Sequence, residues 1–471
     1  MDVQPLAMGG QGQGFGAARY RGYVLGMLTL VYTLSSIDRL LIGVLAQPII
    51  EDFRLQDWQF GLLSGFGFIF MYSVAGIPIA RLAERYNRVR IIAVCLAVWS
   101  VMTMLCGFAW GFVSLLLCRV GVGIGEAGCL PPCNSLIGDY YPARSRAKAL
   151  AIFGLGVALG GVGANTLGSP IAQVWGWREA FIALGAPGLV VAAILWVTVR
   201  EPPRGYSDMP GVRSNGVDSL LVTLRNLAGK RTFWWVTGAS LLSSLVGGAT
   251  ANFQGPLFQR LHELTVAQVS FTFILPMALA AALGSFATGW LTERWADRYP
   301  NAVAWLPGFA ILAATPFYFT SMSADALWVA APAHAIAACL HYSFLGSQYS
   351  IVQGIVKATS RATAVAVYLL ANNLLGSGLG PLIAGYLSDF FGGQLIAASE
   401  LAGQLAIVDC KGTAADLFAR LGPDTAEFCR VVTRDGLQRS LLVFAVICVP
   451  TGVGFLLVSR TLQKDLVSRM A

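Results

Sequence analysis

The stretch ARSRAKALAIF at positions 143–153 returns in altered form as ATSRATAVAVY at positions 358–368. The two segments share Ala, Ser, Arg, Ala, Ala and Ala at matching places and begin 215 positions apart. A second pair, ARLAERYNR at 80–88 and GWLTERWAD at 289–297, shares Leu, Glu and Arg at a separation of 209. Two repeats with nearly the same offset indicate that one half of the chain is a duplicate of the other.

The chain around these repeats is too apolar for a soluble domain. Hydrophobic residues make up 56% of the 471 positions, and Asp, Glu, Lys and Arg only 12%, about half of the roughly 25% found in soluble proteins. Because a span in lipid must satisfy its own backbone hydrogen bonds, apolar stretches of about 20 residues predict an all-α membrane bundle. Twelve such stretches occur, at about 22–46, 58–82, 91–111, 113–138, 149–173, 179–199, 233–256, 268–292, 303–321, 326–354, 363–388 and 439–460.

The repeat divides the twelve predicted helices into two pseudo-symmetric halves of six. We predict an N-terminal half at 22–199, a cytoplasmic linker at 200–232 and a C-terminal half at 233–460 with a long outer loop at 389–438. Residues 1–21 and 461–471 are the predicted cytoplasmic tails. Two cysteines of the outer loop, Cys410 and Cys429, are either joined by a disulfide in oxidising surroundings or left as free thiols.

The distribution of positive charge orients the chain. The net charge of +8 would suggest a nucleic-acid partner in a soluble protein. Here 22 of the 32 Lys and Arg residues lie on one side of the predicted spans and eight on the other, as the positive-inside rule requires of a membrane protein. We therefore predict a multi-pass protein of the cell inner (plasma) membrane, with both termini in the cytoplasm and no nucleic-acid partner.

Four ionisable side chains lie inside predicted spans: Asp38, Arg39, Arg119 and Glu126. Each would cost roughly 2.5–3.5 kcal/mol near the centre of a helix that faces lipid, so all four are expected to face the protein interior or a water-filled cavity. Arg119 and Glu126 are seven residues apart and therefore share one helix face. A rise of about 1.5 Å per residue places Asp38 between them in depth, so we expect Arg119 to pair with either carboxylate.

This group of charges predicts a proton-coupling site made of Asp38, Arg119 and Glu126. Desolvation makes a carboxylate harder to ionise, and a nearby guanidinium makes ionisation easier. A conformational change that moves Arg119 would therefore load or release a proton, with Asp38 as the principal site and Glu126 coupled to it. The alternative is a static ion-pair network that only fixes the packing of the helices.

Other polar side chains are candidates for substrate binding or for gating. Arg39 either binds an anionic head group or pairs with a carboxylate. Polar groups in the second half either contact substrate or form hydrogen bonds between helices. The candidate substrate-binding residues are Arg39, Arg119, Glu126, His341, Asn372 and Asn373. The candidate cytoplasmic gate, which would close the inner side with ion pairs, comprises Glu84, Arg85, Arg88, Asp139 and Arg146. Three histidines are too few for a metal centre, and we expect no cofactor.

The segment Ala80 to Arg88 resembles the inner-loop motif of the major facilitator superfamily, Gly-x-Leu-x-Asp-Arg-x-x-Arg, with Ala for Gly and Glu for Asp. Within that superfamily the chain is similar to the Spinster-like branch. The similarity is carried by IDR at 37–39, ERYNR at 84–88, RVGVGIGEAG at 119–128, and GWREAF and VREPPRG between 176 and 205. The resemblance implies the major facilitator fold, alternating access, a monomer, and anionic lipid-like substrates such as lysophospholipids and sphingosine phosphates.

These observations together predict a proton-coupled secondary transporter of an amphiphilic anion, with protons, substrate and the lipid bilayer as its partners. A proton-coupled carrier of small organic anions is the alternative. A membrane-embedded lipid-modifying enzyme is less favoured, because the sequence shows no nucleophile with a base and no metal cluster at the water boundary. We therefore expect a transporter and not an enzyme.

Overall fold

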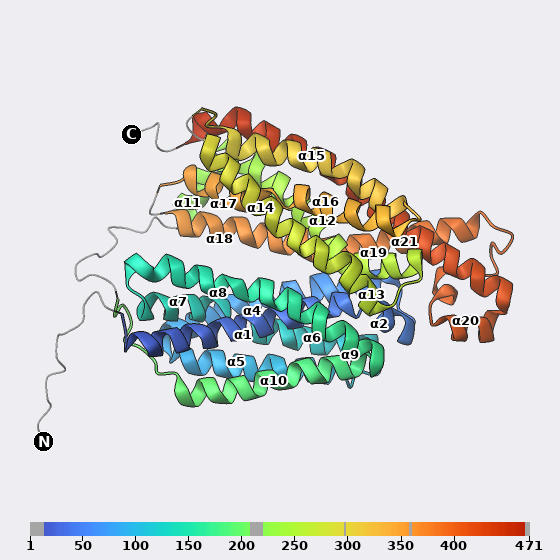
Figure 1. The fold of residues 1–471 in the computed structure, drawn as a ribbon, viewed down its shortest axis with the longest axis horizontal. Coiled ribbons are helices and arrows are strands. Elements are labelled where there is room, and N and C mark those ends of the chain that lie inside the picture. The colour runs from blue at the N-terminus through green and yellow to red at the C-terminus, as the bar shows by residue number, and fades with distance from the viewer. Residues whose placement is uncertain (1–13, 208–219, 296–297, 358–359, 467–471) are drawn as a thin grey trace, which may run out of the picture.

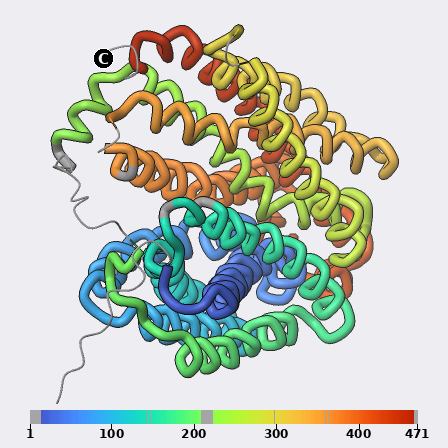
Figure 2. The backbone as a smooth tube through the Cα atoms, turned by 60° about the vertical axis from the view of Figure 1, so that its left-hand side comes forward, coloured from blue at the N-terminus to red at the C-terminus, as the bar shows by residue number. Residues whose placement is uncertain are grey.

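The computed structural model describes residues 14–207, 220–295, 298–357 and 360–466, and every regular element in these ranges is helical. The helices form two bundles that lie side by side (Figures 1 and 2), one blue to green and the other yellow-green to red. The ends of the predicted cytoplasmic tails, at 1–13 and 467–471, and linker positions 208–219 lie outside the described residues.

The N-terminal bundle contains six spans, three of which are built from several consecutive helical elements. The elements are α1 (Ala18–Val44), the short α2 (Ala46–Asp52), α3 (Asp57–Gly61), η1 (Leu62–Phe66), α4 (Gly67–Arg85), α5 (Arg88–Cys106), α6 (Phe112–Glu126), α7 (Leu130–Tyr140), α8 (Ala143–Gly163), η2 (Ala164–Gly168), α9 (Ser169–Val174) and α10 (Trp177–Thr198).

The C-terminal bundle follows the linker helix α11 (Leu220–Ala228) and repeats this plan. Its elements are α12 (Arg231–His262), α13 (Val266–Val269), η3 (Ser270–Ile274), α14 (Leu275–Trp295), α15 (Ala302–Ser323), α16 (Leu327–His341), α17 (Phe344–Gly354), α18 (Arg361–Ala371), η5 (Asn372–Gly378), α19 (Leu379–Ala397), η6 (Ile407–Cys410), α20 (Ala414–Leu421) and α21 (Pro423–Asp465).

Eleven helical segments of the described chain are long and apolar enough to cross a membrane. The helix α12 falls outside this set, yet it packs between α21, α19 and η5 inside the C-terminal bundle, and with it the bundles hold the twelve predicted spans. The outer loop is shorter than predicted: α19 runs to Ala397 and α21 begins at Pro423, because both helices continue beyond the apolar stretch that the sequence marks.

Four π-helical turns interrupt the second and fifth span of each half. They are η1 and η2 in the N-terminal bundle, and η3 and η5 in the C-terminal bundle. Across the seam between the bundles, η1 contacts η5 and η2 contacts η3. The placement of these turns at matching points in the two halves follows the duplication that the sequence repeats indicate.

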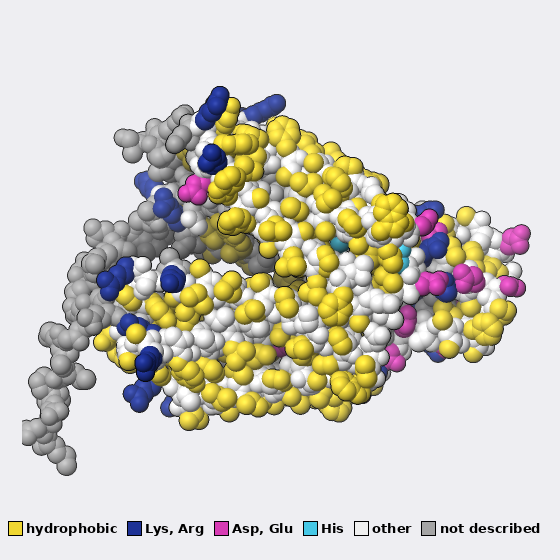
Figure 3. Space-filling model, viewed as in Figure 1, with side chains coloured by type: hydrophobic (Ala, Val, Ile, Leu, Met, Phe, Trp, Pro, Cys, Tyr) yellow, Lys and Arg dark blue, Asp and Glu magenta, His cyan; other side chains and the backbone are white. Residues whose placement is uncertain are grey.

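The two bundles meet at one end and separate at the other. We name the end that holds the Lys- and Arg-rich loops, and where the described chain begins and ends, the inner end, following the positive-inside rule, and the opposite end the outer end. At the outer end α3 packs on α19 and α2 on α12. A Cβ on Gly61 would lie 2.3 Å from the carbonyl oxygen of Pro381, and one on Gly385 2.1 Å from that of Asp57, so only glycine permits this approach. Figure 3 shows a hollow between the bundles that opens toward the inner end.

Candidate functional site

A cavity of about 380 Å³ lies between the two bundles. Its walls come from α1, η1 and α4 on one side and from α12, α17, α18 and η5 on the other, so the cavity is shared by both halves. The polar and aromatic residues that line it are Arg39, Ser64, Phe68, Tyr72, Ser243, Ser244, Asn252, Tyr342, Phe344, Gln348, Tyr349, Tyr368, Asn372, Asn373 and Ser377.

Arg39 is the charged side chain among the described residues that line this cavity. Its side chain is 41% exposed, and its Nη2 donates a hydrogen bond to Oε2 of Glu126 at 2.8 Å. The guanidinium lies 5.4 Å from the ring centroid of Phe68 and 5.0 Å from that of Tyr72, within cation–π range. Glu126 is fully buried and also accepts a hydrogen bond from Ser35 Oγ at 2.9 Å. The cavity therefore presents one cation that a buried carboxylate already neutralises.

Asp38 and Arg119 lie behind this pair, away from the cavity. Both are buried, and Arg119 Nη1 donates to the backbone carbonyl oxygen of Asp38 at 3.3 Å. The guanidinium of Arg119 lies 5.0 Å from the ring centroid of Phe68, so this ring contacts the guanidinium groups of both Arg39 and Arg119. Arg119 Nε and Nη2 and Glu126 Oε1 have no hydrogen-bond partner in the described part of the chain.

The predicted pairing of these charges is corrected by the structure. We expected Arg119 to pair with Asp38 or Glu126, but Glu126 pairs with Arg39, and Arg119 contacts the Asp38 backbone. The physical reason is that Asp38 and Arg39 point in directions about 100° apart on α1, so only Arg39 faces both the cavity and Glu126. Arg39 thus pairs with a carboxylate, as one of the two expectations for it had it, and it also lines the cavity. Binding of an anionic head group by Arg39 stays a prediction.

The candidates from the second half fall into two groups. Asn372 and Asn373 line the cavity, and Asn372 is held by Tyr368, whose backbone carbonyl accepts its amide at 2.9 Å. His341 does not line it: the side chain is fully buried, 3.2 Å from Ser243 Oγ and 3.7 Å from Cys448 Sγ. In this conformation His341 is a packing residue, because α16 turns it toward α12 and α21 and not toward the cavity.

Two of the predicted gate residues meet at the inner end. Arg88 is 1% exposed and pairs with Asp139 of α7 at 2.5 Å and with Glu201, at the start of the linker after α10, at 2.6 Å. Arg146 donates to the backbone carbonyl of Gly138 at 2.7 Å. The other two candidates, Glu84 and Arg85, lie beside an open groove on the surface of α4. The structure therefore brings Arg88 and Asp139 together, and a gating role for the five residues stays a prediction for the closed inner end.

Several functional candidates were missed by sequence reasoning. The cavity wall includes Tyr72, Gln348, Tyr349 and Tyr368, and the Tyr368 hydroxyl donates to Gln348 Oε1. An aromatic residue in an apolar helix carries no periodic signal that separates a cavity wall from a packed core.

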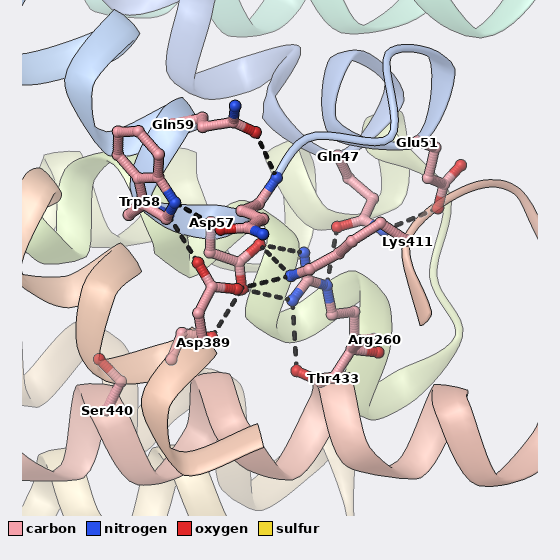
Figure 4. Close-up of polar contacts among 12 residues, drawn as sticks. Gln47, Glu51, Asp57, Trp58, Gln59, Arg260, Asp389, Lys411, Thr433 and Ser440 are labelled. Carbon is pink, nitrogen blue, oxygen red and sulfur yellow. Dashed lines mark hydrogen bonds and ion pairs between the residues drawn. The ribbon is translucent and has the colours of Figure 1, made fainter. Parts of the chain in front are cut away.

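A second charged cluster closes the seam at the outer end and was also missed (Figure 4). It contains Asp57 of the N-terminal bundle with Arg260, Asp389 and Lys411 of the C-terminal bundle, all nine-tenths or more buried. Arg260 Nη2 lies 3.2 Å from Asp57 Oδ1, and Lys411 Nζ lies 3.1 Å from the same oxygen and 3.0 Å from Asp389 Oδ1. The preceding residue, Cys410, forms a disulfide with Cys429 of α21, which decides between the two states that the sequence left open.

Comparison with known proteins agrees with this architecture. The sequence profile described as Major Facilitator Superfamily matches residues 28–381. The chain is 32% identical to an MFS-type efflux pump of Mycolicibacterium smegmatis, over 78% of this chain and 84% of the relative. It is 28% identical to the sphingosine-1-phosphate transporter SPNS2 of Danio rerio, over 77% of this chain and 75% of the relative.

A solved structure matches this chain over nearly its whole length. It is a bacterial homolog of the human lysosomal transporter Spinster, in an inward-facing and unoccupied conformation, and is 40% identical with a TM-score of 0.88. The alignment covers 96% of this chain and 99% of the solved one. The fold and the branch predicted from sequence are therefore confirmed: the chain belongs to the Major Facilitator Superfamily, as a Spinster-like membrane transporter and not an enzyme.

Proposed function

We propose that this transporter carries an amphiphilic anion, such as a lysophospholipid or a sphingolipid-like phosphate, and couples its movement to protons. The observation that carries the proposal is Arg39, a half-exposed cation on the wall of a largely aromatic and apolar cavity. An anionic head group would bind this guanidinium, as charge-assisted hydrogen bonds favour. The acyl chain would lie against the apolar walls and extend toward the inner end, where the bundles separate.

The coupling step follows from competition for Arg39. Glu126 and an anionic head group both need the same guanidinium, which Glu126 Oε2 contacts at 2.8 Å. Protonation of Glu126 would remove its charge and free Arg39 for the anion. Proton and anion would then favour each other's binding, and by linkage the effect is reciprocal.

We assign Asp38 and Arg119 to the same proton-coupling unit. They are buried directly behind Arg39, and Phe68 lies within cation–π range of both guanidinium groups. A change in the charge of Asp38 would alter the field at Arg119 and, through the shared ring contact, the position of Arg39. Asn372 and Asn373 face Arg39 across the cavity from η5 and would donate hydrogen bonds to the head group.

Binding of lysophospholipid to the purified transporter at pH 6 and pH 8 tests the proposal. We expect tighter binding at the lower pH, and Glu126→Gln, which carries no competing charge, should bind at least as tightly as the parent at both pH values. Arg39→Ala should lose about tenfold to hundredfold in affinity, the range for a hydrogen bond to a charged group. Unchanged binding in Arg39→Ala, or full pH dependence in Glu126→Gln, would contradict the assignment.

The role of Asp38 needs a transport measurement. Asp38→Asn in proteoliposomes should abolish uptake driven by a pH gradient while substrate exchange without a gradient continues. If pH-driven uptake persists in this variant, Asp38 belongs to a static network that only fixes helix packing.

A carrier of small organic anions is the second candidate. The observation that favours it is the cavity volume of about 380 Å³, which lies near the lower limit for ligand sites of roughly 300–1,000 Å³. A thermal-shift screen across lysolipids and small organic anions separates the two, because only the class that enters the cavity should raise the unfolding temperature in an Arg39-dependent way.

A further inference from the structure

In the outer charged cluster, one residue of the N-terminal bundle inserts into a polar socket formed by the C-terminal bundle. Asp57 is the first residue of α3 and the one charged group that the N-terminal bundle contributes to its centre. The socket belongs to the C-terminal bundle: Arg260 from α12, Lys411 from the loop after η6, and Ser388, whose hydroxyl donates to Asp57 Oδ2 at 2.6 Å. Asp57 is fully buried there.

Lys411 is unusual for a residue of an outer loop, because its side chain is only 3% exposed. Its Nζ lies between two carboxylates, 3.1 Å from Asp57 Oδ1 and 3.0 Å from Asp389 Oδ1. Asp389 Oδ2 in turn accepts the backbone amide of Trp58 at 2.9 Å, so both carboxylates touch the seam between the bundles.

We propose that Lys411 is a latch that holds the outer end of the transporter closed, and that the Cys410–Cys429 disulfide keeps this latch in place. The formal charges of the two carboxylates, Asp57 and Asp389, are balanced by those of Arg260 and Lys411. Without Lys411, two buried carboxylates would share one guanidinium, and like charges in a buried site repel. Opening of the outer end withdraws Asp57 from the socket, so loss of Lys411 favours opening.

The disulfide explains how a loop lysine is held so precisely. Cys410 precedes Lys411 in the chain, and Cys429 lies on α21 one turn before Thr433. The carbonyl oxygen of Thr433 accepts Arg260 Nη1 at 3.2 Å. The bond thus ties the latch to the same helix turn that positions the second cation of the socket.

The test measures conformation and needs no substrate, so it is independent of the proposed function. Asn252→Cys places a thiol on the cavity wall, and a membrane-impermeant maleimide added from the outer side reports opening of the outer end. The parent without this substitution gives the background from the seven free cysteines.

Lys411→Met, which keeps the side-chain length but removes the charge, should raise the labelling rate at least about tenfold, because the closed population falls. Lys411→Met with Asp389→Asn restores a neutral cluster and should return the rate to near the parent value. Lys464→Met, at an exposed position of the inner end, is the matched control and should leave the rate unchanged.

A rate for Lys411→Met equal to that of the parent overturns the latch. If this variant does not fold, Lys411→Arg and the neutral double variant decide: both should stay closed, and a rise in labelling in both would overturn the charge argument. Replacing both Cys410 and Cys429 by Ser should raise outer labelling in part, and an unchanged rate would overturn the role given to the disulfide.

Discussion

The two ends of this transporter use buried ion pairs in opposite ways. At the outer end, Asp57 of one bundle is held by Arg260 and Lys411 of the other, so the charges cross the seam. At the inner end, Arg88 pairs with Asp139 of its own bundle and with Glu201, which directly follows that bundle's last helix, so the charges stay on one side of the seam. The comparison teaches that the location of a pair relative to the seam, and not its burial, decides whether it closes an end or stiffens a half.

The inner pairs make the N-terminal bundle a single mechanical unit. Arg88 begins α5, Asp139 is near the end of α7, and Glu201 follows α10, so one guanidinium joins the inner ends of three spans. Its Nη2 also donates to the carbonyl of Pro202 at 3.1 Å. A half tied in this way can rock as a body, as alternating access in such folds requires.

The largest expected effect is a loss of stability when the inner cluster, Arg88 with Asp139 and Glu201, is broken. Arg88→Ala leaves two carboxylates without their buried partner, which should cost about 3–5 kcal/mol of unfolding free energy. Thermal unfolding in detergent measures this loss of stability, and Arg85→Ala, a substitution at an exposed position, is the control. Labelling of the cavity from the outer side should not change, and a strong rise would show that the inner cluster also controls the seam.

Breaking the outer cluster should act on conformation instead. Asp57→Asn removes the charge that enters the socket and should weaken the closed outer end by about 1.5–3 kcal/mol, the range for hydrogen bonds to charged groups. The rate at which a maleimide added from the outer side labels a cysteine in the cavity measures this change. The control is Asp52→Asn, since Asp52 pairs with Arg178 inside the N-terminal bundle. Equal effects of the two substitutions would remove the distinction between the pairs.

A smaller effect concerns pH at the outer seam. Burial raises the pKa of Glu51 above its usual value, although Gln47 and Arg260 act in the opposite direction. A carboxyl group with a raised pKa stabilises the fold below its unfolded-state pKa of about 4.3, and this contribution is lost as the pH rises through the folded-state pKa. Glu51→Gln should therefore gain stability relative to the parent at pH 8 compared with pH 4, by less than about 1 kcal/mol. Thermal melts at the two pH values check the sign, with the exposed Glu263→Gln as control.

The smallest expected effect tests whether an ion pair that crosses the seam must also be buried to hold the outer end closed. Arg54 pairs with Asp416 across the seam at 2.6 Å, but the Arg54 side chain is 53% exposed. Because solvent screens such a pair, Arg54→Gln should change outer labelling by at most a few tenths of a kcal/mol, roughly the lower range for surface pairs. A shift as large as that of Asp57→Asn would mean that any crossing pair, buried or not, closes the outer end.

The sequence predicts the architecture well because its signals are periodic and repeated. Apolar stretches and the duplicated segments together give twelve spans and two halves. The orientation inferred from the asymmetry of Lys and Arg stays a prediction. The cost of charge in lipid correctly places Asp38, Arg39, Arg119 and Glu126 in the interior.

The sequence could not predict which of the buried charged side chains form ion pairs with one another. A step of one residue turns a side chain by about 100°, so knowing the depths of Asp38 and Arg39 does not say which of them faces Glu126. The outer cluster gave no signal, because Asp57 precedes the predicted span 58–82 and Lys411 lies in a predicted loop. Charged residues are ordinary at both places, and only the meeting of distant segments makes them a buried group.

The four π-helical turns carry a consequence for how the halves move. A wide turn holds one residue more than the regular helix and is found mostly at functional points, so it is a natural place for a helix to bend. Here each such turn contacts a π-helical turn of the other half, η1 of the second span with η5 of the fifth, and η2 of the fifth span with η3 of the second. Bending at one of these turns would therefore act directly on a turn of the other half, and a substitution that straightens one member of a contacting pair should stiffen the other as well.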